Sequence, residues 1–89
     1  MKRRRHEDWP VWWEWELELS FHLLLRMPRR EFNETDLRLL LDRATGFSAA
    51  VIPGRFLIYA DWDGTPWKII VEPDFQSTRL VVLTAYAVE

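Results

Sequence analysis

The chain has 89 residues, of which 48% are hydrophobic and six are tryptophan, and its formal net charge is −2. This length fits one domain, and the lack of cysteine excludes disulfides and cysteine-bound metal and favours a reducing, cytoplasmic location. No apolar run approaches the roughly 20 residues of a membrane-spanning helix, so we expect no membrane partner. The acidic balance also argues against a protein that coats nucleic acid by charge alone.

The beginning of the chain differs in composition from the rest. We expect residues 1–12 to be a flexible or partly ordered tail and residues 13–89 to be one α+β domain. The basic block at residues 2–5 is more typical of a solvated tail than of an arm that binds nucleic acid. Trp9 and Trp12 fall outside the pattern that follows, so they either cap the edge of the core or contact a protein partner.

Strict alternation of apolar residues with glutamates over residues 13–19 predicts a half-buried strand. Ser20 is a suitable N-cap for a short helix over residues 21–27. Pro28 lacks the backbone donor that a helix needs, so it should end or kink this helix.

A second helix is predicted after Asn33. Asn33 is a suitable N-cap, and acidic residues follow it in the first turn, where the helix dipole favours them. Apolar residues then recur at helical spacing from Leu37 to Ala44. We expect this helix to end at Gly46.

The remaining chain predicts three strands, over residues 55–61, 67–72 and 79–88. The first two flank an Asp-Gly pair at residues 63–64, a typical hairpin turn, and residues 72–74 should form the next turn. The element order β-α-α-β-β-β predicts an α+β fold. In this fold two helices from the N-terminal half pack on one face of a roughly four-stranded antiparallel sheet.

His22 and Arg26 are four residues apart, which places them on one face of the predicted helix, and Arg30 extends the row by another turn. An arginine binds phosphate oxygens through two hydrogen bonds, and a histidine transfers protons near neutral pH, so the row suits phosphate chemistry. The alternative is a structural histidine at a helix end, beside arginines that pair with nearby acids. Those acids are Glu31, Glu34 or Asp36.

The last predicted strand carries two hydroxyl groups, on Thr84 and Tyr86. Alternation places both on one face together with Val82, whereas Ala85 and its apolar neighbours take the other face. The two residues are either ordinary strand formers or a polar site on the face away from the main helix. Four further residues are candidates for the same cleft, although alternation does not fix their faces: Arg55, Tyr59, Lys68 and Glu72.

Several segments share a consistent spacing over about residues 13–88. They are residues 22–27, Arg30, 36–38 and 44–45 in the first half, and residues 54–56, 67–74 and 81–86 in the second. Together these segments resemble a bacterial family of small uncharacterised domains (DUF4258-like). That family is placed with the barnase–EndoU–colicin–RelE group of folds, in which helices pack on an antiparallel sheet.

Many members of that group are metal-independent ribonucleases, often toxins. The resemblance therefore implies a metal-independent endoribonuclease-like domain that cleaves RNA by attack of the ribose 2′-hydroxyl, without a metal or cofactor. The implied site residues are His22, Arg26, Arg30, Thr84 and Tyr86. The alternatives are a non-catalytic protein-binding module, which contacts its partner through Trp9 and Trp12, and an inhibitor that targets another protein.

Overall fold

The structure is a computed structural model, and it describes residues 9–28 and 32–88. Within these residues two α-helices and a short 3-10 helix accompany a five-stranded sheet with the order β1-β5-β4-β3-β2. The helices are η1 (Val11–Glu14), α1 (Phe21–Arg26) and α2 (Glu34–Asp42). The strands are β1 (Glu16–Leu19), β2 (Ala44–Ala49), β3 (Phe56–Trp62), β4 (Thr65–Asp74) and β5 (Arg79–Ala87).

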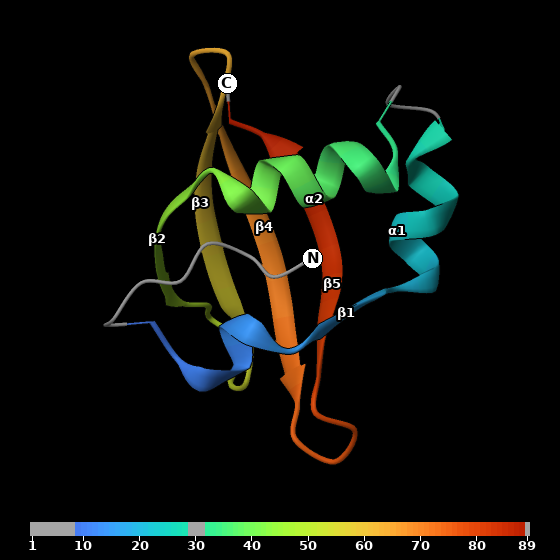
Figure 1. Cartoon of the computed structure of the whole chain (residues 1–89), viewed down its shortest axis with the longest axis vertical. Coiled ribbons are helices and arrows are strands. Elements are labelled where there is room, and N and C mark those ends of the chain that lie inside the picture. Colours follow the sequence, from blue (N-terminus) through green and yellow to red (C-terminus); the bar gives the residue numbers. More distant parts are fainter. Residues whose placement is uncertain (1–8, 29–31, 89) are drawn as a thin grey trace.

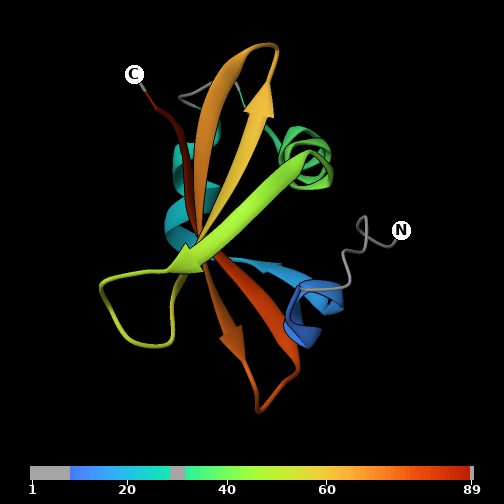
Figure 2. The ribbon, with the colours of Figure 1, turned by 90° about the vertical axis from the view of Figure 1, so that its left-hand side faces the viewer.

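The helices take different positions around the sheet (Figure 1, Figure 2). α2 and η1 lie over the same face, which we call the inner face; the face turned away from α2 is called the outer face. α1 contacts β5 and stands beside it, so it flanks the sheet rather than covering a face. The expectation that both helices pack on one face is therefore wrong for α1.

The sheet is mixed and five-stranded, so the expected four-stranded antiparallel sheet is also wrong. Strands β2 to β5 form antiparallel pairs in succession, whereas β1 pairs parallel to β5, with Leu17 opposite Leu80. A hairpin can be predicted from its turn residues, but a parallel pair joins strands that are far apart in the chain. Both helices and three strands separate β1 from β5, so no local signal specifies their pairing.

β2 is the strand that the sequence did not predict. The helix α2 ends at Asp42, and the apolar residue Ala44, which continues the helical stripe, is buried in β2 instead. Gly46 lies inside this strand beside an irregularity in the register with β3. Glycine inside a strand often marks such an irregularity, so the predicted role of Gly46 as a helix end is wrong.

Two other boundaries differ from the prediction. η1 replaces the first part of the strand expected over residues 13–19, because the Trp13 backbone N–H donates to the Pro10 carbonyl (3.0 Å) and closes a helical turn. β4 continues through residues 72–74, where a turn was expected. Pro73 is tolerated in β4 because the pairing with β3 has already ended, so one side of the strand needs no donor there.

Three predicted local features are confirmed. The Ser20 hydroxyl caps α1 by accepting a backbone N–H, and Asn33 and Asp36 form a capping box at the start of α2. Asp63 and Gly64 both have positive φ, 50° and 81°, as a type I′ hairpin turn requires. Each of these features depends on residues that are close in the sequence, which is why the pattern predicts it.

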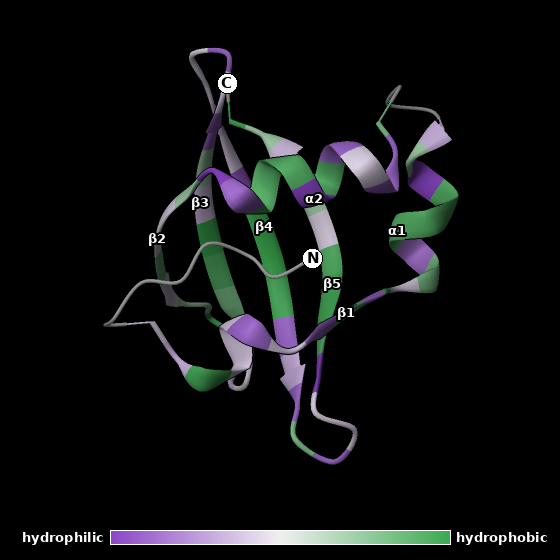
Figure 3. Ribbon diagram, in the orientation of Figure 1, coloured by the Kyte–Doolittle hydropathy of each residue, from purple (hydrophilic) through white to green (hydrophobic). Residues whose placement is uncertain are grey.

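The hydrophobic core lies between the inner face and α2. Three register partners on β3, β4 and β5 are at most 1% exposed, namely Ile58, Ile69 and Ala85. α2 contributes three leucines with no exposed surface, namely Leu37, Leu40 and Leu41. Figure 3 shows the corresponding apolar stretches of β3 and β4 in green, between α2 and η1 in that view.

Aromatic residues around η1 extend the core. Trp12 is 4% exposed, and its ring centroid lies 4.8 Å from that of Phe56. The ring of Trp9 lies 4.4 Å from Trp13 and 5.0 Å from Phe47. Trp9 and Trp12 therefore pack against the core from the segment that was expected to be a tail, and Trp12 has almost no surface left for a partner.

Candidate functional site

α1 is held against β5 through Ser20, the residue that joins β1 to α1. The Ser20 backbone N–H donates to the Val82 carbonyl at 3.0 Å, and the hydroxyl donates to the Leu83 carbonyl at 3.0 Å. The same hydroxyl accepts the Leu23 N–H at 3.1 Å and so caps the helix. One side chain therefore fixes both the start of α1 and its position beside β5.

An extra residue in β5 decides which face Thr84 and Tyr86 take. Consecutive residues of β4 pair with Val82 and Thr84, so Leu83 forms a bulge. Val82 and Ala85 both lie on the inner face, where they are 0% and 1% exposed. Thr84 and Tyr86 consequently share the outer face. The prediction that Val82 lies on the same face as these two residues is wrong.

His22 and Arg26 lie at the same levels along the sheet as Thr84 and Tyr86. α1 and β5 run in the same direction from the contact between them (Figure 1, Figure 2). A helix rises about 1.5 Å per residue, which puts His22 about 3 Å and Arg26 about 9 Å beyond that contact. A strand rises about 3.3 Å per residue, which puts Thr84 about 3 Å and Tyr86 about 10 Å beyond it.

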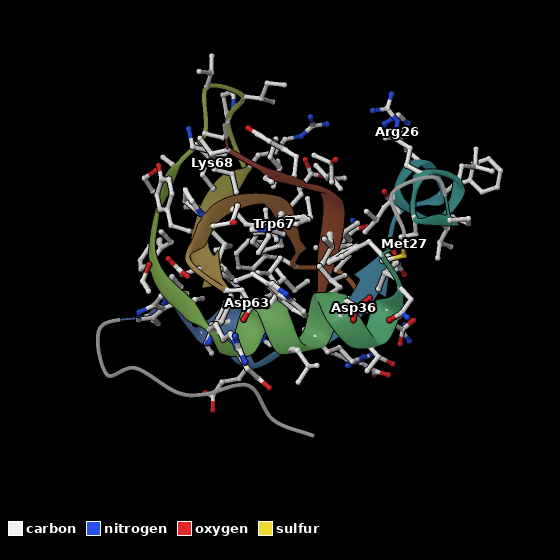
Figure 4. All side chains as sticks on the ribbon, turned by 90° about the horizontal axis from the view of Figure 1, so that it is seen from above. Arg26, Met27, Asp36, Asp63, Trp67 and Lys68 are labelled. Carbon is white, nitrogen blue, oxygen red and sulfur yellow. The ribbon has the colours of Figure 1, made fainter. Side chains whose placement is uncertain are left out.

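The side chains of α1 also point to the appropriate side. In Figure 4 Arg26 points away from α2, towards the side of the sheet on which Lys68 lies, whereas Met27 points towards α2. Met27 is 6% exposed and belongs to the core. His22 precedes Arg26 by one helical turn and therefore shares its direction. Both residues thus flank the outer face, which carries Thr84 and Tyr86.

These four residues are accessible. His22 and Arg26 are exposed, Thr84 is half-buried, and Tyr86 is 37% exposed. Among the described residues no side chain of these four has a hydrogen-bond or ion-pair partner. Arg30, the fifth predicted site residue, lies outside the described part of the chain. The four side chains are therefore positioned around one surface without being joined into a network.

The register adds residues whose face the sequence left open. Lys68 is the direct partner of Tyr86 on one side and of Tyr59 on the other, so all three lie on the outer face. The Tyr59 hydroxyl is 2.7 Å from the Ser48 hydroxyl on β2. Only the strand register could find this row, because each member comes from a different strand and no motif links them.

Arg55 and Glu72, the other two candidates for the cleft, bind each other. The Arg55 Nε donates to a Glu72 carboxylate oxygen at 3.1 Å, and both side chains are partly exposed. The guanidinium is therefore already engaged by a carboxylate. This pair borders the site rather than supplying it with a free cation.

Two cavities lie near these residues. One of about 230 Å³ is bounded by the loop at residues 50–52, Arg55 and the outer-face partners Leu57 and Ile70, and it adjoins Thr84, which pairs with Ile70. The other, of about 650 Å³, lies at the β4–β5 hairpin and is lined by aromatic, proline and acidic residues. His22, Arg26, Thr84 and Tyr86 line neither of the two, so the candidate site in the described part of the chain is an exposed surface beside the smaller cavity.

Two cationic side chains thus lie on opposite sides of β5, the strand that carries Tyr86: Lys68 on β4 pairs with Tyr86, and Arg26 stands on α1. His22 is one helical turn away from Arg26. Guanidinium and ammonium groups bind phosphate, imidazole transfers protons, and exposed tyrosine rings stack on bases. The arrangement has the chemistry of a site for a phosphate-bearing ligand with an aromatic part.

No family model matches the chain, and comparisons with curated proteins and with solved structures likewise find no match. The resemblance to small bacterial domains therefore stays a prediction. In the part of the chain that the structure describes, no helix is long and apolar enough to cross a membrane.

Proposed function

We propose that this protein is a metal-independent endoribonuclease-like domain, possessing the activity implied by its resemblance to the small bacterial domains and acting in the cytoplasm. The observation that supports this best is the shared position of His22, Arg26, Thr84 and Tyr86. They come from two elements that are far apart in the sequence, yet they lie at matching levels on one side of the sheet.

In the proposed mechanism His22 is the general base that removes the proton of a ribose 2′-hydroxyl. The resulting oxygen attacks the adjacent phosphorus, and Arg26, together with Arg30, stabilises the negative charge that develops on the phosphorane. Tyr86 donates a proton to the leaving 5′-oxygen, and Thr84 orients the phosphate. The products are a 2′,3′-cyclic phosphate and a free 5′-hydroxyl, and DNA resists cleavage because it lacks the attacking group.

The test is cleavage of total RNA in the presence of a chelator, followed by chemical mapping of the new ends. We expect cyclic phosphate ends with the wild-type protein and a rate lower by about 10²–10⁴-fold with His22→Ala, the usual range for a general base. Arg26→Ala should reduce the rate by about 10²-fold or more, since it removes a charge that stabilises the transition state.

The matched control is Arg38→Ala, which removes an arginine from α2, on the other side of the sheet. Arg38 pairs with Glu34 at 3.1 Å on an exposed surface, and a pair of this kind contributes little to stability. This variant should cleave RNA at the wild-type rate. Cyclic phosphate ends formed at full rate by His22→Ala would contradict the assignment.

A second candidate function is a protein-binding module or an inhibitor that acts by protein contact. It is supported by the outward side of α1, where Phe21, Leu24 and Leu25 are 76%, 50% and 59% exposed. Exposed apolar groups of this kind favour protein contacts. A wild-type protein that neither binds nor cleaves RNA would favour this candidate over the ribonuclease.

A further inference from the structure

The proposed reaction uses the side chains of α1 and β5 and gives no role to Tyr59 and Lys68 on the adjoining part of the outer face. Together with Tyr86, which the reaction does use, they form a row of one residue from each of β3, β4 and β5. We propose that the row binds one dinucleotide step of single-stranded RNA, with a base on each tyrosine ring and the linking phosphate on Lys68. The proposal rests on the proposed function in taking RNA as the ligand.

The spacing of the row selects single-stranded over double-stranded RNA. Neighbouring strands are about 4.8 Å apart, so Tyr59 and Tyr86 are separated by roughly 9.6 Å across the sheet. Successive bases within a helix are only about 3.4 Å apart along the strand. Both rings can therefore be occupied only by bases that are splayed away from each other, as proteins commonly bind single-stranded RNA.

Tyr59 and Tyr86 differ in the partners of their hydroxyl groups and in their exposure. The Tyr59 hydroxyl is held by Ser48 at 2.7 Å and the residue is half-buried, so its ring is fixed while its hydroxyl is already engaged. The Tyr86 hydroxyl has no partner among the described residues and is the more exposed of the two. Tyr59 therefore serves as a stacking surface, and Tyr86 both stacks and keeps a hydroxyl for the reaction.

Lys68 lies between Tyr59 and Tyr86 in the register of the three strands. It forms no ion pair with another described residue. Two carboxylates of the outer face have partners of their own: Asp61 on β3 accepts the Gly64 N–H at 2.9 Å, and Glu72, four residues from Lys68 along β4, binds Arg55 at 3.1 Å. An ammonium group on a long, flexible stem suits a phosphate whose position varies slightly.

The row and the proposed active site adjoin each other at Tyr86. Tyr86 belongs to both, and Arg26 lies beyond it on the side opposite Lys68. A strand of RNA that crosses β3, β4 and β5 would therefore bring its next phosphate to Arg26 and His22. The row positions the nucleotides on one side of the bond that is cut.

Binding is tested with a labelled single-stranded RNA in which every ribose is 2′-O-methylated, so that it cannot be cleaved by 2′-hydroxyl attack. Affinity is measured by fluorescence anisotropy over a series of salt concentrations. Lys68→Gln should weaken binding roughly ten-fold and lower the slope of log K against log salt by about 0.7, the value for one lost phosphate contact with a single strand. Tyr59→Leu should weaken binding roughly ten-fold and leave the slope unchanged, because stacking carries no charge.

Two control variants separate these effects from general ones. Tyr59→Phe loses the hydroxyl and keeps the ring, so it should bind within about two-fold of the wild type. Arg38→Gln removes the same charge as Lys68→Gln from the other side of the sheet, and it should leave the salt slope unchanged. If Tyr59→Leu proves unfolded by circular dichroism, Tyr86→Leu tests the same stacking at a more exposed position of the row.

The outcomes distinguish this proposal from the ribonuclease itself. Equal losses of affinity in Lys68→Gln and Arg38→Gln would overturn the proposal that the row binds RNA, and so would a wild-type Kd weaker than about 10⁻⁴ M. Either result would do so even where unmodified RNA is cleaved in a manner that depends on His22. Binding that depends on Lys68 and Tyr59 without cleavage of unmodified RNA would support RNA binding by the row and contradict the ribonuclease activity. A preference for duplex RNA over single strands would overturn the row as well.

Discussion

The inner and outer faces of this sheet are made by the same strands and have opposite characters. Ile58, Ile69 and Ala85 are register partners on the inner face and are almost completely buried. The residues that follow Ile58 and Ala85, and the one that precedes Ile69, form the row Tyr59, Lys68 and Tyr86 on the outer face. Because side chains alternate along a strand, one register fixes both rows. The inner row stabilises the domain, and the outer row is free to carry polar groups.

The two faces can be compared through the loss of stability on substitution. The largest difference is expected between two neighbouring isoleucines of β4. Ile69→Ala should lower the free energy of unfolding by about 2–5 kcal/mol, because it leaves a cavity in a fully buried site. Ile70→Ala, on the outer face, should cost only about 1 kcal/mol, because Ile70 is half-buried and already exposes part of its side chain to solvent. Urea unfolding of both variants measures the difference.

Equal losses at the two positions would contradict the assignment of the faces. If Ile69→Ala does not fold, Ile69→Val and Ile70→Val give the same comparison with smaller changes. A single buried methylene group contributes about 0.8 kcal/mol, which urea unfolding can resolve.

The sequence predicted the local parts of this architecture and missed the long-range ones. Ser20, Asn33 and the turn at residues 63–64 use side chains or backbone preferences that act within a few residues. The parallel pairing of β1 with β5 depends on segments at opposite ends of the domain, and β2 lacks the alternation that marks a strand. Periodicity alone therefore predicts the α+β class, but not the number of strands or their order in the sheet.

The same distinction applies to the candidate site. Helical spacing correctly grouped His22 with Arg26, and strand spacing grouped Thr84 with Tyr86. Alternation could not detect the bulge at Leu83, because an inserted residue leaves no signature in a run of small and β-branched side chains. It also could not join Lys68 to Tyr86, since that pair exists only through the register of β4 with β5.

An intermediate effect is expected at the junction that brings α1 to the outer face. Ser20→Ala removes the hydroxyl that caps α1 and that donates to the Leu83 carbonyl. Loss of such a cap costs about 1 kcal/mol, and the lost bond to β5 adds roughly another. Ser20→Thr keeps a hydroxyl and serves as the control. Thermal unfolding measures the loss of stability in both variants.

Ser20→Ala also tests whether the position of α1 matters for the chemistry of the outer face. Because Ser20 sets the level of α1 along β5, Ser20→Ala should reduce RNA cleavage by more than its loss of stability explains, at a temperature where the protein stays folded. Cleavage that is unchanged in folded Ser20→Ala would show that the position of α1 does not matter for the outer face.

The smallest expected effect lies at the end of β4, where the chain enters the β4–β5 hairpin turn. There the hydrogen bonds from Ser77, and then the Gln76 N–H at 3.0 Å, lower the pKa of the exposed Asp74 carboxyl. A lowered pKa in the folded state means that the charged carboxylate favours folding. This contribution is fully present above the ordinary pKa of an aspartate, about 3.9, and it is lost as the pH falls through the lower pKa of the folded state.

Asp74→Asn keeps an oxygen acceptor but removes the titration. The unfolding temperature of the wild type should therefore exceed that of Asp74→Asn slightly near neutral pH, by less than the effect of Ser20→Ala, and the difference should vanish in acid. Thermal unfolding of both proteins between about pH 7 and pH 2 measures it. A difference that persists at the acid end would mean that the aspartate acts through its shape rather than its charge. RNA binding by the outer face at neutral pH should be the same in both proteins, because Asp74 lies in the hairpin, away from the row at Lys68.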